Sequence, residues 1–327
     1  MRRPGLAPLV PLYAAGLAAR EWTLRVGWEQ KKRLRCPVVS VGSISAGGAG
    51  KTPLTIALAR LLTANGIATD VLSRGFGRKT EQALAVDPDG EAEIFGDEPL
   101  LIARHTAVPV FVAKQRWMAG ELAERRTGDG CTVHLLDDGF QHRQLERALD
   151  VVLVGGEDLR DHLLPAGNLR EPKSALHRAE VLAVREEDEV ALAWLKEHPC
   201  DGGAWRYRRV MQWPHEMPQP VVAFCGIAKP EQFLEGLRSG GIAIQRELIF
   251  RDHQPYSHTQ ILQLRRAMLD TGTRAFMTTA KDMARLGRAA EELRQIAPVF
   301  CAELEVIFSD PAAIIQRIQK LLAAWNG

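Results

Sequence analysis

The chain lacks several features that mark whole classes of protein. Its 327 residues carry a formal net charge of only +2, which argues against a generic nucleic-acid binder. The sequence has neither internal repeats nor low-complexity tracts. Its five cysteines are scattered, odd in number and without C-x-x-C spacing, so we expect reduced thiols in the cytosol and no zinc site. The apolar share of 46% suffices for a globular core, and the length suits two domains.

The N-terminal apolar stretch is too short to cross a bilayer. Residues 6–19 are uncharged, but fourteen residues that include Pro8 and Pro11 cannot span about 30 Å of hydrocarbon. Residues 1–35 hold eight basic and two acidic side chains around this stretch. We expect a basic amphipathic helix, bearing Trp22, that lies in the interface of an anionic leaflet. A helix packed on the protein's own core and an exported signal peptide are the alternatives.

The most informative stretch joins a β-branched run, residues 37–41, to a glycine-rich turn and a helix. The turn follows the phosphate-loop pattern G-x-x-x-x-G-K-[ST], with a serine at the first glycine position, and consists of Ser45, Ala46, Gly47, Gly48, Ala49, Gly50, Lys51 and Thr52. Backbone N–H groups of such a turn wrap phosphate oxygens, Lys51 reaches the β- and γ-phosphates, and the Thr52 hydroxyl binds Mg²⁺. A chance glycine-rich turn before a helix is the alternative.

A pair of acids follows the next strongly apolar strand. Residues 132–136 predict a buried strand, and Asp137 and Asp138 come directly after it. An acid at this point, downstream of a phosphate loop, is the Walker B arrangement that holds Mg²⁺ directly or through water. The guanine-reading pattern Asn-Lys-x-Asp does not occur in the sequence, which favours ATP over GTP.

Three further polar groups stand where strands end or helices begin. Arg74 lies between glycines after the strand expected at 68–72, a good position for binding an anion. Asp97 and Glu98 open a helix, and taken alone they are complements to its dipole. His253 follows the strand expected at 243–250, where a catalytic and a structural role are equally supported.

Strands alternate with helices along the whole chain, which predicts parallel pairing with right-handed crossovers. The fold class is therefore α/β: a P-loop NTPase-like, mostly parallel sheet flanked by helices, with a second, smaller α/β domain. Glycines and prolines produce a composition break near residues 200–219, where we place the domain boundary. The expected parts are a membrane-associating helix (1–30), a P-loop kinase domain (31–212), a smaller α/β domain (213–308) and a C-terminal helix that packs back on the core (309–327).

Taken in order, these motifs resemble the tetraacyldisaccharide 4′-kinase family over nearly the whole chain. The resemblance rests on the basic N-terminus, the phosphate loop, the runs LSRGFG (72–77), GDEP (96–99), LDDGFQH (136–142) and TTAKD (278–282), and segments 165–172, 225–227 and 250–256. It implies an ATP- and Mg²⁺-dependent phosphotransferase that acts on the 4′-hydroxyl of a tetraacylated glucosamine disaccharide 1-phosphate, a lipid A precursor, giving lipid IVA. It also implies a peripheral enzyme at the cytoplasmic face of the bacterial inner membrane, with this lipid and the membrane surface as partners. Neither a nucleic acid nor an obligate protein partner is expected.

With this resemblance, each candidate residue receives a hypothetical role. Lys51 is the point charge on the phosphates, and Thr52, Glu98 and Asp138 bind Mg²⁺. Asp97 is the base that takes the 4′-hydroxyl proton, paired with His253 from the second domain. The candidate anion and hydroxyl ligands for the disaccharide are Arg74, Arg116, His142 and Arg170. A nucleotide-switched metallochaperone or GTPase of P-loop type, and a non-enzymatic membrane adaptor, are the alternative functions.

Overall fold

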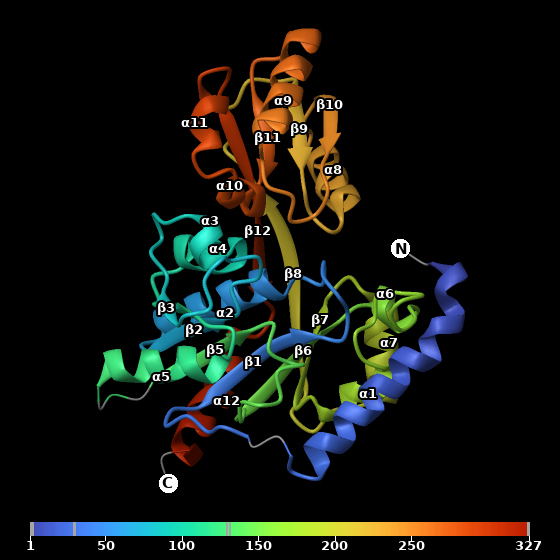
Figure 1. Cartoon of the computed structure of the whole chain (residues 1–327), viewed down its shortest axis with the longest axis vertical. Coiled ribbons are helices and arrows are strands. Elements are labelled where there is room, and N and C mark those ends of the chain that lie inside the picture. Colours follow the sequence, from blue (N-terminus) through green and yellow to red (C-terminus); the bar gives the residue numbers. More distant parts are fainter. Residues whose placement is uncertain (1–2, 29–30, 129, 131, 326–327) are drawn as a thin grey trace.

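One twelve-stranded sheet runs through the described part of the chain, which is residues 3–28, 31–128, 130 and 132–325 of the computed structural model (Figure 1). The strand order is β10-β9-β11-β12-β8-β7-β6-β1-β5-β2-β4-β3. Predictions that concern residues 1, 2, 29, 30, 326 and 327, and Cys131, lie outside the described residues.

The first and larger lobe carries the phosphate loop. Its strands are β1 (Val38–Ser43), β2 (Thr69–Ser73), β3 (Leu84–Ala85), β4 (Val110–Val112), β5 (Val133–Asp137), β6 (Leu149–Val154), β7 (Val181–Arg185) and β8 (Ala204–Gln212). Its helices are α2 (Lys51–Ala64), α3 (Ala92–Phe95), α4 (Asp97–His105), α5 (Arg116–Thr127), α6 (Gly156–Leu159), η2 (Lys173–Arg178) and α7 (Glu189–Glu197).

The second lobe is a smaller α/β unit at one end of the sheet (Figure 1). Its strands are β9 (Val221–Cys225), β10 (Ile244–Ile249), β11 (Phe276–Thr279) and β12 (Val299–Phe308). Its helices are α8 (Pro230–Ser239), α9 (His258–Thr271), α10 (Ala280–Leu286) and α11 (Ala289–Arg294). The chain then returns through α12 (Pro311–Trp325), whose Ile314 and Ile318 are buried in the same core cluster as Leu54 and Leu58 of α2.

The centre of the sheet is parallel and buried on both faces. Every residue of β1 is buried, and β1 pairs in parallel with both β5 and β6. Parallel strands covered by helices need apolar side chains on both faces, which explains the continuous Val- and Leu-rich runs in the sequence. Because the carboxyl ends of these strands share one edge, the turns after β1, β2 and β5 come together there. The predicted α/β class with a mostly parallel sheet is confirmed.

The two lobes are joined by a pair of long antiparallel strands. β8 pairs in parallel with β7 at its start and antiparallel with β12 further on, where Met211 lies opposite Leu304 and Tyr207 opposite Phe308. The composition break near residues 200–219, where we placed the domain boundary, contains a strand at residues 204–212 that we had not predicted. The alternation of aromatic Trp205 and Tyr207 with arginines is the sequence pattern that could have predicted this strand, and both aromatic residues are buried.

The N-terminal segment forms η1 (Pro4–Leu9) and α1 (Val10–Arg25) along the outside of the larger lobe (Figure 1). None of residues 3–24 is buried, and the segment is attached by polar contacts. The Tyr13 hydroxyl donates to the Arg170 carbonyl at 2.9 Å, and the Arg20 guanidinium donates to the Gln141 carbonyl at 2.8 Å. Among the described residues, no helix is both long enough and apolar enough to cross a bilayer.

Candidate functional site

The phosphate loop lies between β1 and the start of α2. Gly47, Gly48 and Gly50 have φ angles of +92°, +68° and +90°, which residues other than glycine rarely adopt. The loop is held from outside by segment 165–172, since the Ala46 amide donates to the Asn168 carbonyl at 2.8 Å and Arg170 Nε donates to the Ser45 carbonyl at 3.0 Å. The extra glycines supply the backbone freedom that Ser45 at the first position does not.

Asp138 is held between two cations. Lys51 Nζ lies 3.5 Å from its Oδ1, and the Arg170 guanidinium donates to both carboxylate oxygens, at 3.0 and 2.7 Å. Burial by itself raises the pKa of Asp138, but the charges of Lys51 and Arg170 hold it well below its usual range. Asp138 is therefore ionised beside the phosphate loop.

Asp137 lies next to hydroxyls and other carboxyls, whereas Asp138 lies next to cations. The Asp137 carboxyl accepts hydrogen bonds from the Thr55 hydroxyl at 2.9 Å and the Thr52 hydroxyl at 3.4 Å. Burial, together with the charges of Glu98 and Asp138, raises its pKa to about 7. Three carboxyls that repel one another near a threonine hydroxyl form the all-oxygen donor set that Mg²⁺ prefers. We had not assigned Asp137 to the metal, although it belongs to the predicted Walker B pair.

This raised pKa predicts how the stability of the nucleotide-free protein depends on pH. The folded-state pKa of Asp137 lies above its unfolded value of about 3.9, so stability falls as the pH rises from about 4 to 7, by up to about 4 kcal/mol from this group. Asp137→Asn should remove that loss, so the variant's stability should fall less between pH 5 and pH 8. Urea unfolding at both pH values, with the exposed Asp201→Asn as control, measures the difference. Equal pH dependence in variant and wild type would contradict the assignment.

A second cluster joins the two lobes at the start of α4. Asp97 Oδ2 lies 3.1 Å from Nδ1 of His253 and 3.1 Å from Nη2 of Arg285, and 3.9 Å from Nζ of Lys281. Asp97 belongs to the larger lobe, and the other three belong to the smaller one. The structure therefore brings together the predicted pair Asp97 and His253, and adds two cations from α10 that we had not assigned.

The hydrogen bonds in this cluster determine which nitrogen of His253 carries the proton. Lys281 Nζ has only donors and lies 3.3 Å from Nε2, so Nε2 accepts and Nδ1 donates to Asp97. Burial raises the pKa of Asp97, but the His253 hydrogen bond and the charges of Lys281 and Arg285 hold it below its usual range. Lys281 Nζ is also 3.4 Å from Glu98 Oε1, which links this cluster to the carboxyls near Thr52.

The four predicted substrate ligands share one electropositive region next to Asp138. Burial and the nearby charge of Arg74 lower the pKa of the buried Arg116 to about 10, and the charge of Arg170 contributes. Burial and the charge of Arg116, with smaller contributions from other arginines, lower the pKa of His142 to about 3, so this imidazole is neutral. No described residue hydrogen-bonds Nε of Arg116 or Nε2 of His142. An N–H donor of Arg116 and a ring nitrogen of the neutral His142, both without partners among the described residues, suit an anionic or hydroxylated ligand.

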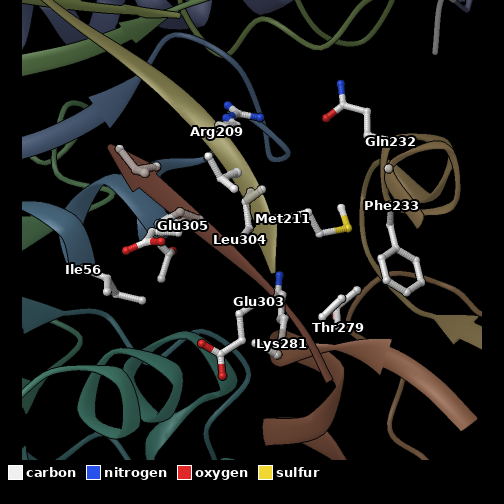
Figure 2. A pocket seen from close by; sticks show the side chains of 18 of the residues that line it. Ile56, Arg209, Met211, Gln232, Phe233, Thr279, Lys281, Glu303, Leu304 and Glu305 are labelled. Carbon is white, nitrogen blue, oxygen red and sulfur yellow. The ribbon is translucent and has the colours of Figure 1, made fainter. Parts of the chain in front are cut away.

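A cavity of about 1170 Å³ between the lobes connects the phosphate loop to the Asp97 cluster. Its lining includes Lys51, Thr52, Glu98, His253 and Lys281. β8 and β12 form one wall and α8 another, as Figure 2 shows for the side chains of Met211, Leu304 and Phe233.

Arg209 of β8 is a further cation in this cavity, and we had not predicted it from the sequence (Figure 2). Its guanidinium donates to the Ala49 carbonyl, and a Cβ placed on Gly50 would lie 2.5 Å from its Nη2. A glycine at position 50 is therefore required by its φ angle, and a side chain there would also displace the Arg209 guanidinium from the loop.

Comparisons with known proteins agree with this geometry. A family model described as tetraacyldisaccharide-1-P 4′-kinase matches residues 2–323. The tetraacyldisaccharide 4′-kinase of Koribacter versatilis is 40% identical over 98% of this chain and 99% of its own, and that of Geobacter metallireducens is 35% identical over 97% of both. A crystal structure of LpxK from Aquifex aeolicus in complex with ATP is similar with a TM-score of 0.74 and 30% identity, covering 97% of this chain and 98% of that one.

Proposed function

The chain belongs to the tetraacyldisaccharide-1-P 4′-kinase family, and we propose that it transfers the γ-phosphate of ATP to the 4′-hydroxyl of a tetraacylated glucosamine disaccharide 1-phosphate, giving lipid IVA. The observation that carries this proposal is the cavity whose lining includes Lys51 of the phosphate loop and His253 of the Asp97 pair. A phosphate donor and a sugar alcohol bound there would meet between the lobes. The GTPase alternative receives no support from these relatives.

The donor side of the reaction needs positioning and charge neutralisation. Residues 45–52 cradle the triphosphate with their N–H groups, and Lys51 supplies a positive charge to the transferring phosphoryl group. Thr52, Glu98 and Asp138 are the proposed ligands of Mg²⁺, and the position of Asp137 beside Thr52 supports adding it to this set. When bound, Mg²⁺ neutralises charge on the β- and γ-phosphates.

On the acceptor side, the proton of the 4′-hydroxyl must leave as the new O–P bond forms. The ionised Asp97 carboxylate accepts this proton, and its hydrogen bond with Nδ1 of His253 orients it. Because its pKa is held low, Asp97 is a weak base, so it takes the proton only as the new O–P bond forms. Arg74, Arg116, His142 and Arg170 bind the anionic and hydroxyl groups of the disaccharide.

Each domain has its own role in binding the nucleotide or in activating the acceptor. The P-loop kinase domain (31–212) holds the nucleotide, and the smaller domain (213–308) contributes His253. Closure of the two would exclude water and limit ATP hydrolysis. The long strand pair β8 and β12 is the connection that such a motion would bend.

The N-terminal segment would bring the enzyme to its lipid at the cytoplasmic face of the inner membrane. The exposed apolar side chains of η1, α1 and the turn that follows are Leu9, Leu12, Trp22, Val26 and Trp28. Exposed apolar and aromatic side chains next to basic residues suit the interface of an anionic leaflet. Tyr13 and Arg20 join this helix to segments 165–172 and 136–142, so membrane contact and acceptor binding are adjacent.

A charge placed on this helix should weaken membrane binding. Leu12→Glu is expected to lower partitioning onto anionic vesicles by about tenfold or more, because it removes apolar area and adds repulsion. Leu269→Glu on α9 is the matched control, since Leu12 and Leu269 are both 73% exposed. Vesicle co-sedimentation measures both variants. Equal partitioning of the two would show that α1 does not touch the bilayer.

The proposed activity is tested by incubating the protein with γ-labelled ATP, Mg²⁺ and the acylated disaccharide 1-phosphate in detergent micelles. We expect labelled lipid only when the acceptor is present, and less of it when γ-labelled GTP replaces γ-labelled ATP. Nucleotide hydrolysis without labelled lipid, or a preference for GTP, would favour the nucleotide switch instead. No acceptor-dependent ATP consumption at all would favour the adaptor.

A further inference from the structure

A second group of polar side chains lies at the edge of the sheet opposite the phosphate loop. Cys36 precedes β1, His134 lies near the start of β5, and Glu124 comes from α5. His134 is opposite Val38 in β1 and Asp70 in β2, so the cluster is near the amino ends of three neighbouring strands. The kinase function uses none of these residues.

The three candidate ligand atoms of this cluster lie slightly farther apart than the ligands of a bound zinc ion. The Cys36 sulfur, one ring nitrogen of His134 and a Glu124 carboxylate oxygen all lie within 4.8 Å of one another. Zn–S and Zn–N bonds of about 2.3 and 2.0 Å put such ligands about 3.5 Å apart in a tetrahedral site, so a small inward movement suffices. The His134 and Cys36 residues are 0% and 1% exposed, and Glu124 is half-buried.

Hydrogen bonds around the cluster orient His134 and Glu124, and the Cys36 sulfur lies 3.9 Å from the Gly130 carbonyl oxygen. Nδ1 of His134 lies 2.7 Å from Asp70 Oδ1, which leaves Nε2 aimed at Cys36 and Glu124. Nε2 makes no hydrogen bond of ordinary geometry to a described residue, although Glu124 Oε1 is 3.5 Å away. The Cys36 amide donates to Glu124 Oε1 at 2.9 Å. A carboxylate that orients a histidine from behind is the usual outer partner of a metal-bound imidazole.

We propose that Cys36, His134 and Glu124 bind one zinc-class divalent ion, with water as a fourth ligand on the partly exposed side of Glu124. A thiolate, an imidazole and a carboxylate are ligands that Zn²⁺ combines in tetrahedral sites. When the ion binds, Nε2 of His134 gives up any proton that it carries, and the Cys36 thiol loses its proton to become a thiolate ligand. The bound ion ties α5 to the sheet behind the nucleotide site.

From the sequence we expected no zinc site, because no C-x-x-C spacing occurs. The ligands here come from three separate elements, so only the packing of α5 on β5 and β1 brings them together. Cysteine spacing carries no information about such a site.

The test uses the full-length protein, from which bound metal is first removed with a chelator. Zinc is then added in the presence of excess Mg²⁺, which occupies the carboxyls near Thr52 and keeps zinc from binding there. We expect one zinc per chain by elemental analysis after desalting. Cobalt in place of zinc should give the near-ultraviolet absorption of a sulfur-to-cobalt bond. Cys36→Ser should abolish that band, and Cys200→Ser, which alters a cysteine outside the cluster, should keep it.

Asp70→Asn provides a second variant that leaves all three ligands in place. It should weaken zinc binding about 10–100-fold, as loss of an outer partner does. Failure of the wild-type protein to retain stoichiometric zinc, or a cobalt band unchanged in Cys36→Ser, would overturn the proposal and leave a protonated histidine between two carboxylates. Zinc content, zinc affinity and the cobalt band are all measured without assaying kinase activity, so these results do not depend on the proposed function.

Discussion

Asp97→Ala should lower kcat by about 10²–10⁴-fold while the Kd for ATP changes no more than a few-fold. Asp97 lies outside the phosphate loop, and its partners are His253, Lys281 and Arg285. Its loss removes the proton acceptor for the 4′-hydroxyl but leaves the nucleotide cradle intact. Steady-state kinetics with saturating lipid, together with nucleotide titration, separate the two quantities.

His253→Ala should have an effect of similar size, because the pair acts as one unit. The double variant Asp97→Ala/His253→Ala should be little slower than either single one. His258→Ala is a suitable control, since this exposed histidine lies nearby in the sequence on α9. If either single variant keeps its rate within a few-fold of wild type, its assigned catalytic role is wrong.

Lys51→Ala should reduce kcat/KM by at least about 10²-fold, the usual cost of removing one group aimed at developing charge. Lys51 begins α2, and its ammonium group is the cation of the phosphate loop nearest to Asp138. Without it, both the γ-phosphate and the buried Asp138 lose a positive neighbour. Lys79→Ala, at a surface lysine paired with Glu93, is the matched control. Near-normal kinetics for Lys51→Ala would mean that the triphosphate lies elsewhere.

Sequence reasoning succeeded where the information is local. The phosphate loop needs only a strand, three glycines, Lys51 and a helix in that order, and the Walker B acids need only a buried strand before them. Hydrophobic runs located the central parallel strands because burial on both faces leaves no other pattern.

The rest depends on which elements meet in space. His253 was equally compatible with a structural and a catalytic role until the packing of α10 against α4 placed it 3.1 Å from Asp97. Arg285 and Arg209 contact the site through the same packing and through β8, a strand that the glycine- and proline-rich flanks obscured. Cys36 and His134 are nearly a hundred residues apart in the sequence, and strand register brings them together.

One lobe is proposed to hold the triphosphate while Asp97, oriented by His253, receives the proton of the sugar alcohol. A crystal structure with Mg²⁺, a non-hydrolysable ATP analogue and the acylated disaccharide would show both parts together. We expect the γ-phosphate beside Lys51 over residues 45–52, with the 4′-oxygen between that phosphate and Asp97. A triphosphate tail remote from Lys51, or a 4′-oxygen out of reach of Asp97, would contradict it.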